Sequence, residues 1–134
     1  MTVRILIADN HELVRSAISN LIREAGWKVC GTASDGKTAV EKALELKPDL
    51  LILDYRLPDR DGVSIGHDIR SFLPNIPILL CTLFASPTLE SEAKNSGFQG
   101  VVQKSDGTAL IAVIRSTLGL DKTISSIEDR EGAK

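Results

Sequence analysis

The chain has 134 residues, of which 43% are hydrophobic and 25% are charged, and its formal net charge is −2. These values are typical of one soluble globular domain and exclude the strong basic field of nucleic-acid-binding domains, so we expect no direct contact with nucleic acid. The apolar runs are too short for a membrane span or a signal peptide, and we expect a cytoplasmic protein without membrane contact.

Strand patterns and helix patterns alternate five times along the chain. Each strand pattern is short, rich in Leu or β-branched residues, and bounded by Gly, Pro, Asn or Asp. Three of them are almost continuously apolar, which is typical of central strands covered on both faces. The predicted strands span residues 3–9, 27–33, 49–54, 76–82 and 99–104.

Helix patterns fill the gaps between these strands. The first carries an apolar stripe from Leu13 to Ala25 and stops at Gly26, whereas the third places Phe72 on its inward side. The fourth opens with Ser86 as the N-cap and a Pro at the first helical position. The predicted helices span about residues 13–25, 36–47, 63–72, 86 onward and 105–119.

Repeated strand–helix units predict an α/β fold, with a doubly wound, five-stranded parallel sheet and helices on both faces. We assign residues 1–119 to this domain. Residues 120–134 are mostly polar and charged, and we interpret them as a linker or C-terminal tail, with an extension of the last helix as the alternative.

Polar residues fall at the carboxyl ends of the predicted strands, which form the working edge of such a sheet. Asp9 ends the first strand and Asn10 follows it, Asp54 ends the third, Thr82 ends the fourth and Lys104 ends the fifth. Each alone has a simpler interpretation: Asn10 or Asp54 as a cap, Thr82 as a β-former, Lys104 as a surface charge. Their concentration at one edge is harder to explain by capping.

This group of side chains suits phosphoryl transfer. Asp9, Asn10 and Asp54 offer the oxygen ligands that Mg²⁺ prefers, and a carboxylate can accept a phosphoryl group. Thr82 and Lys104 would contact the oxygens of the transferred group and neutralise their charge.

The stretches "ILIADNHELVR", "LLILDYRLPDRDG", "CTLFAS" and "GVVQKS" resemble those of response regulator receiver domains over about residues 2–119. The resemblance implies the strand order 2-1-3-4-5 and a non-enzymatic domain whose Asp54 accepts a phosphoryl group from a sensor histidine kinase. It further implies Mg²⁺ held by Asp9, Asn10, Asp54 and the backbone carbonyl of Arg56, with Thr82 and Lys104 on the phosphoryl oxygens. Pro58 and Gly62 would shape the loop that follows Asp54.

The opening "ADNHELVR" most resembles receivers that carry a C-terminal helix-turn-helix domain, which implies a role in transcription regulation with the output domain absent from this chain. The last helix is apolar around much of its circumference, so we expect part of it to cover the sheet and part to form a homodimer or partner interface. Cover by a missing domain or by the tail is the alternative. The apolar positions are Leu110, Ile111, Val113, Ile114 and Leu118.

Three positions depart from the family's usual pattern. Asn10 replaces an acidic metal ligand, which predicts weaker Mg²⁺ binding and slower phosphorylation. Leu83 replaces a small residue and is expected to narrow access to Asp54. Val101 replaces the usual switch aromatic, for which Phe84 and Phe98 are candidate substitutes.

Other interpretations stay open from these residues. Asn10 and Leu83 motivate a pseudo-receiver, a phosphorylation-independent interaction domain. An aspartyl-phosphate hydrolase would need an acid where Arg56 stands, and a flavodoxin-like cofactor binder would need a phosphate-cradling turn after the first strand. His11 and His67 show no ligand spacing, and residues 59–61 indicate a polar turn rather than a second cation site.

Overall fold

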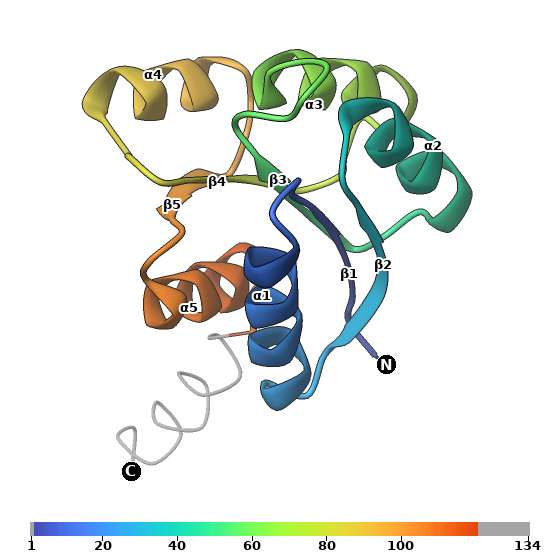
Figure 1. The fold of residues 1–134 in the computed structure, drawn as a ribbon, viewed down its shortest axis with the longest axis vertical. Coiled ribbons are helices and arrows are strands. Elements are labelled where there is room, and N and C mark those ends of the chain that lie inside the picture. The colour runs from blue at the N-terminus through green and yellow to red at the C-terminus, as the bar shows by residue number, and fades with distance from the viewer. Residues whose placement is uncertain (1, 121–134) are drawn as a thin grey trace, which may run out of the picture.

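The computed structural model describes residues 2–120, in which strands and helices alternate along the chain (Figure 1). Residues 121–134, and with them nearly all of the predicted tail, lie outside the described part. The elements are β1 (Arg4–Ala8), α1 (Glu12–Glu24), β2 (Lys28–Ala33), α2 (Gly36–Leu46), β3 (Leu50–Asp54), α3 (Gly62–Phe72), β4 (Ile78–Thr82), α4 (Pro87–Asn95), β5 (Gly100–Gln103) and α5 (Gly107–Thr117).

The strands form one parallel sheet in the order β2-β1-β3-β4-β5. This confirms the predicted doubly wound α/β fold and the order 2-1-3-4-5. Every residue of β3 and β4 is buried, as expected for central strands with apolar side chains on both faces. The register pairs Asp54 with Cys81 and Thr82 with Gln103, so the carboxyl ends of three neighbouring strands lie at one edge.

Helices cover both faces of the sheet (Figure 1). In that view α2, α3 and α4 lie above it, whereas α1 and α5 lie below it. Each side has its own cluster of buried side chains, because alternate residues of a strand point to opposite faces. Leu51, Leu53 and Leu80 face α2–α4, whereas Ile52 and Leu79 face α1 and α5.

Short polar side chains fix where four of the helices begin. The predicted Ser86 cap is confirmed, since its hydroxyl accepts a hydrogen bond from the Leu89 amide at 3.1 Å. Asp35, Asp61 and Asp106 cap α2, α3 and α5 in the same way. The expected stop after α1 is also confirmed, since Gly26 has a φ of +89°.

The alternative interpretation of Asn10 as the cap of the first helix is wrong. The N-cap position of α1 is His11 rather than Asn10, and no side chain caps this helix. Asn10 is exposed, and among residues 2–120 its side chain makes no hydrogen bond. The β1–α1 loop is held instead by the hydrogen bonds of Asp9 described below.

Three apolar residues predicted to face inward are exposed. Leu13 is 84% exposed and Ala17 is also exposed, because these two, one turn apart, lie on the outer edge of the apolar stripe of α1, whereas Ile18 is buried. Phe72, the last residue of α3, is 63% exposed. In α5, Leu110 and Ile114 are buried against the sheet, as expected for its inward face. Among residues 2–120, no helix has both the length and the apolar character needed to cross a bilayer.

Candidate functional site

Two buried carboxylates and a buried ammonium meet at the carboxyl edge of the sheet. Lys104 Nζ lies 2.7 Å from Asp9 Oδ2 and 3.0 Å from Asp54 Oδ2. The three side chains are 5%, 2% and 4% exposed, respectively. The structure therefore brings together three of the residues predicted from the sequence.

Strand ends place all three groups. Asp54 is the last residue of β3, Asp9 follows β1 directly and Lys104 follows β5 directly. The amide of Lys104 donates to the Thr82 carbonyl at 2.7 Å, which continues the β4–β5 ladder and holds the lysine over the edge. The Asp9 amide donates to the Ala33 carbonyl at 2.9 Å and extends the β1–β2 ladder.

The local charge is unbalanced. Two carboxylates against one ammonium leave a single net negative charge in this buried cluster. Burial raises the pKa of Asp54 above its ordinary value, and the hydrogen bond from Lys104 offsets only part of the shift. Burial alone would lower the pKa of Lys104, but its contacts with Asp9 and Asp54 together raise it. The net negative charge of the cluster therefore favours the binding of a further cation.

Backbone amides hold the second oxygen of each carboxylate. Asp9 Oδ1 accepts a hydrogen bond from the His11 amide at 2.8 Å, and Asp54 Oδ1 accepts one from the Arg56 amide at 3.1 Å. Arg15 Nη1 donates to the Asp9 carbonyl at 2.7 Å and ties α1 to this loop. Both carboxylates are thus fixed in orientation, as a site for charged ligands requires.

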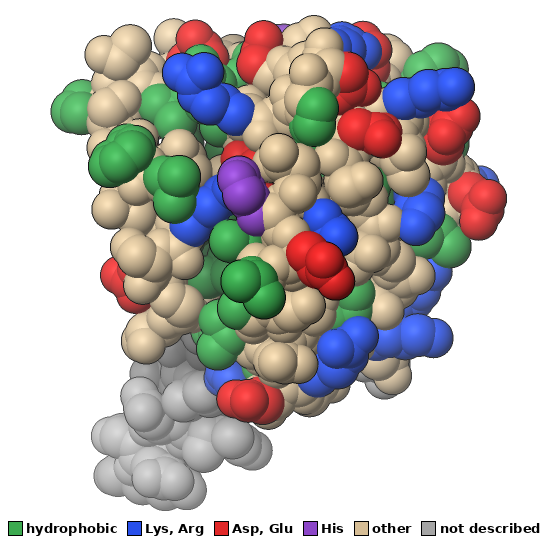
Figure 2. All heavy atoms as spheres, viewed as in Figure 1, with side chains coloured by type: hydrophobic (Ala, Val, Ile, Leu, Met, Phe, Trp, Pro, Cys, Tyr) green, Lys and Arg blue, Asp and Glu red, His purple; other side chains and the backbone are tan. Residues whose placement is uncertain are grey.

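A cavity of about 200 Å³ opens beside the acceptor position, and its walls include Asp54, Thr82, Leu83 and Lys104. Thr82 is 8% exposed, and its hydroxyl accepts a hydrogen bond from the Phe84 amide at 3.3 Å. Leu83 and Phe84 are 55% and 83% exposed. In Figure 2 a histidine lies near the middle of this face, with hydrophobic side chains to its left. Leu83 is one of the residues that line the cavity beside Asp54, the position from which it was predicted to narrow access.

His11 belongs to this site, although its sequence pattern gave no indication of ligand spacing. Its Nδ1 lies 3.2 Å from Asp9 Oδ1, and ligand atoms of Asp9, His11 and Asp54 lie within 4.8 Å of one another. The signal available was its position two residues after Asp9, in the loop that leaves the working edge. His67, in α3, is outside this group.

These residues fit a divalent cation. Oδ2 of Asp9 and Oδ2 of Asp54 are buried, and within residues 2–120 their only polar contact is with Lys104. Such oxygens are ligands that Mg²⁺ prefers. Burial raises the pKa of the neighbouring Cys81 thiol to about 12, so this thiol carries no charge at neutral pH in the metal-free domain.

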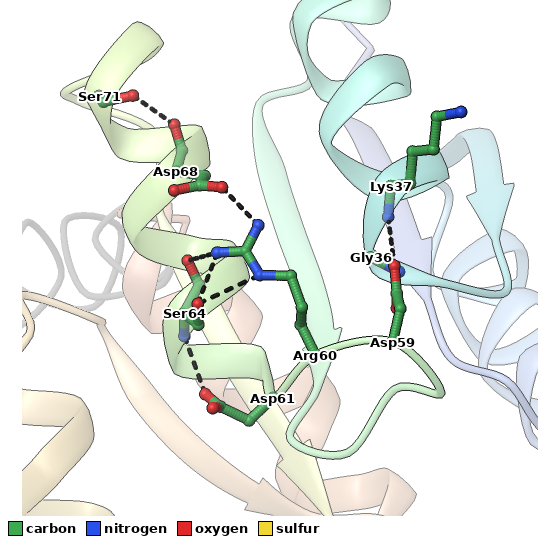
Figure 3. A network of polar contacts seen from close by, with 8 residues as sticks. All are labelled: Gly36, Lys37, Asp59, Arg60, Asp61, Ser64, Asp68 and Ser71. Carbon is green, nitrogen blue, oxygen red and sulfur yellow. Dashed lines mark hydrogen bonds and ion pairs between the residues drawn. The ribbon is translucent and has the colours of Figure 1, made fainter.

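In the turn after Asp54, each of the charged residues 59–61 contacts a different part of the structure (Figure 3). Asp59 accepts hydrogen bonds from the Gly36 and Lys37 amides at 2.7 and 3.0 Å, and so covers the first turn of α2. Arg60 pairs with Asp68 at 2.5 Å, and Asp61 caps α3 by accepting from the Ser64 amide at 2.9 Å. The predicted polar turn is confirmed.

Residues 5–115 match the response regulator receiver domain as a family. The chain belongs to this family. It is a regulatory domain of two-component signalling rather than an enzyme, and its membership implies a histidine kinase as partner.

Curated relatives include the response regulator protein VraR of Staphylococcus saprophyticus, to which this receiver is 36% identical over 119 residues. VraR of Staphylococcus aureus strain NCTC 8325 shows the same identity over the same length. Each match covers 87% of this chain and 57% of the relative, so the receiver spans little more than half the length of these relatives.

Solved structures agree with this assignment. A two-component response regulator of the LuxR family from Aurantimonas has a TM-score of 0.84 and 30% identity, covering 89% of this chain and 86% of that chain. The signal receiver domain of NarL from Mycobacterium tuberculosis has a TM-score of 0.82 and 28% identity, covering 88% and 97%.

Neither candidate substitute for the switch aromatic, Phe84 or Phe98, lies in β5, where Val101 occupies the usual position of that aromatic. Phe98 is 6% exposed and packs on Gly66, where an added Cβ would lie 2.3 Å from its ring. It is therefore a core residue of the α3–α4 face. Phe84 is exposed beside the cavity, and Val101 is half-buried in β5.

Proposed function

We propose that Asp54 accepts a phosphoryl group from the phosphohistidine of a sensor histidine kinase. The N–P bond of the donor breaks, an O–P bond to an Asp54 carboxylate oxygen forms, and the donor imidazole leaves with the electron pair of the broken bond. The observation that carries the proposal is the position of Asp54, 3.0 Å from Lys104 Nζ and on the wall of an open cavity.

The neighbouring side chains suit the product. Transfer converts the Asp54 carboxylate to an acyl phosphate and adds negative charge beside Lys104 and Thr82. Lys104 already lies in contact with both carboxylates, so it needs little movement to reach a phosphoryl oxygen. The Thr82 hydroxyl is the neutral donor on the same cavity wall. Both roles fit the charge stabilisation on which phosphoryl transfer depends.

We propose Mg²⁺ as the cation, held by Asp9, Asp54, the amide oxygen of Asn10 and the backbone carbonyl of Arg56. When bound, the ion neutralises charge on the transferring group. Within residues 2–120 the Arg56 carbonyl accepts no hydrogen bond, which leaves it available as a ligand. Asn10 supplies an oxygen without a charge, which predicts weaker binding than an aspartate would give.

The family and the lengths of its relatives suggest the output. We propose that the receiver acts in the cytoplasm, as part of a longer transcription regulator that also has a helix-turn-helix domain. We further propose that α5 contributes to a homodimer. A groove of about 420 Å³ beside α1 and α5 supports the dimer, since Leu21, Ile111 and Ala112 give it an apolar lining. Phosphorylation would bias this surface through Thr82 and Lys104.

Intact mass after incubation with acetyl phosphate and Mg²⁺ tests the acceptor. We expect one phosphoryl adduct on the wild type and none on Asp54→Ala or in EDTA. Asn10→Asp should reach the same adduct at a lower Mg²⁺ concentration, because it restores a charged ligand.

Two other outcomes change the conclusion. An adduct that persists on Asp54→Ala would move the acceptor elsewhere. The absence of any adduct on the wild type, with one on Asn10→Asp, would favour the pseudo-receiver, a receiver fold that acts through protein contacts alone.

A further inference from the structure

We infer that His11 is a nitrogen ligand in the cation site, and that it shifts the site's preference from Mg²⁺ toward divalent transition-metal ions. The inference rests on the cation site proposed at Asp54 and concerns which ions that site selects.

The geometry of His11 and Asp9 suits two adjacent ligands of one ion. Nδ1 of His11 and Oδ1 of Asp9 are 3.2 Å apart, a hydrogen-bonded contact in the metal-free domain that an ion would replace, while Oδ2 of Asp9 stays the buried oxygen without a hydrogen bond. Two neighbouring ligands of an octahedral ion at about 2.0–2.1 Å are themselves about 2.9 Å apart. The observed separation is thus within a few tenths of an ångström of the required one. The third group, a carboxylate oxygen of Asp54, lies within 4.8 Å of both.

The backbone holds His11 in this position. Its amide donates to the same Asp9 oxygen at 2.8 Å, so the residue is anchored to the carboxylate on which its ring lies. Its side chain is 56% exposed, which leaves room for the ring to turn toward an ion without disturbing the core. The ring nitrogen that faces Asp9 is the one that would bind. In the metal-free contact Nδ1 donates to the carboxylate, so binding requires Nδ1 to lose this proton, with the neutral ring then carrying its proton on Nε2.

Ligand chemistry gives the direction of the preference. Mg²⁺ favours oxygen ligands and keeps much of its water, whereas imidazole favours the later divalent transition metals. Asn10, a neutral amide, replaces a charge that would favour Mg²⁺. The gain from a nitrogen ligand should therefore increase from Mg²⁺ through Mn²⁺ to Co²⁺.

Calorimetric titration of the untagged domain with each of these ions, without any phosphodonor, tests the inference. Replacing His11 by Ala should change Mg²⁺ affinity less than about twofold, lower Mn²⁺ affinity about threefold and lower Co²⁺ affinity about tenfold or more. His67→Ala is the matched control, since it removes the other histidine from an exposed position on α3. It should leave all three affinities unchanged.

Pulsed EPR of the Mn²⁺-bound wild type gives a readout that does not depend on affinity or on the folding of a variant. We expect a ¹⁴N coupling that disappears in His11→Ala and persists in His67→Ala. Mg²⁺ binding and Asp54 phosphorylation without this coupling would overturn the inference and leave the proposed function intact. Failure of all three ions to bind the wild type would overturn the proposed cation site as well.

Discussion

Asp54 combines burial with a negative charge that Lys104 must share with Asp9. Lys104 Nζ contacts both carboxylates, so neither has a cation to itself. The raised pKa of Asp54 follows from burial and indicates that its ionised form is less stable in the folded domain than in water. A nucleophile held in this way gains reactivity at the expense of folding stability.

Asp54→Asn should therefore stabilise the metal-free domain at pH 7.5, because Asp9 and Lys104 would then form a balanced pair. We expect a gain of about 1 kcal/mol, or a rise in Tm of about 3–5 °C for a domain of this size. Thermal unfolding in EDTA measures it. A lower Tm for the variant would mean that the contact with Lys104 outweighs the cost of burial.

The same comparison has a defined pH dependence. The unfolded chain releases the Asp54 proton near the ordinary value of 3.8, and the folded domain releases it at higher pH. Between these values the folded state binds more protons, so its stability falls as the pH rises. The stability gain from Asp54→Asn should thus be fully present above the pKa of Asp54 in the folded domain. It should disappear as the pH falls toward 3.8. An advantage independent of pH would show that charge is not its cause.

At the level of secondary-structure elements, the turn between β3 and α3 links the acceptor to two helices. Asp59 holds the start of α2 and Asp61 holds the start of α3, while Arg56 in the same turn donates to Asp54. Three consecutive charged residues, 59–61, therefore act as structural contacts to different partners. The sequence indicated a polar turn here, but not which residue would reach α2, because that contact spans more than twenty positions.

Asp59→Ala should destabilise the domain at neutral pH, since two amides of α2 lose their acceptor. Those amides lower the pKa of Asp59, so its contribution is present above 3.8 and lost as the pH falls through the lower folded value. Urea unfolding at pH 7 and at pH 3 should show a difference from the wild type that shrinks at the lower pH. Asp59→Asn, which retains one acceptor oxygen, should lose less than Asp59→Ala.

Gly66→Ala should destabilise the domain despite a higher helix propensity. The new Cβ would lie 2.3 Å from Cζ of Phe98, and overpacking of this kind costs about 1–3 kcal/mol. Combining it with Phe98→Leu should recover part of that loss, which urea unfolding of both single variants and the double variant would measure. Simple addition of the two losses would show that the ring is not the obstacle.

At the scale of the whole molecule, the receiver has apolar side chains at two separate places on its surface. The α1–α5 side has the apolar groove with Ile111 and Leu21, whereas exposed Phe72 lies at the opposite end of the sheet from Asp54. If α5 pairs two copies as proposed, Ile111→Arg should convert a phosphorylated dimer to a monomer in sedimentation velocity runs. Phe72→Arg is the control, and an equal loss of dimer in both variants would contradict the role of α5.

The sequence was sufficient for the sheet and for the buried triad, for a physical reason. Apolar runs ending in Asp54 and Thr82 mark strands, and parallel strands bring their carboxyl ends to one edge. His11 was missed because a loop residue has no periodicity to reveal it. Leu13 and Phe72 were placed inward because helical spacing shows which residues share a face but not how much of that face the sheet covers.

The sheet separates two sets of buried side chains, one beneath α2–α4 and the other beneath α1 and α5. Strand residues that face one set do not contact the other, so the two interiors share backbone but little side-chain packing. Volume changes on one side should then combine additively with changes on the other. Libraries that randomise the buried side chains of each interior separately should therefore recombine freely. The side of the domain that faces one partner can then diversify, while the packing of the opposite side is inherited unchanged.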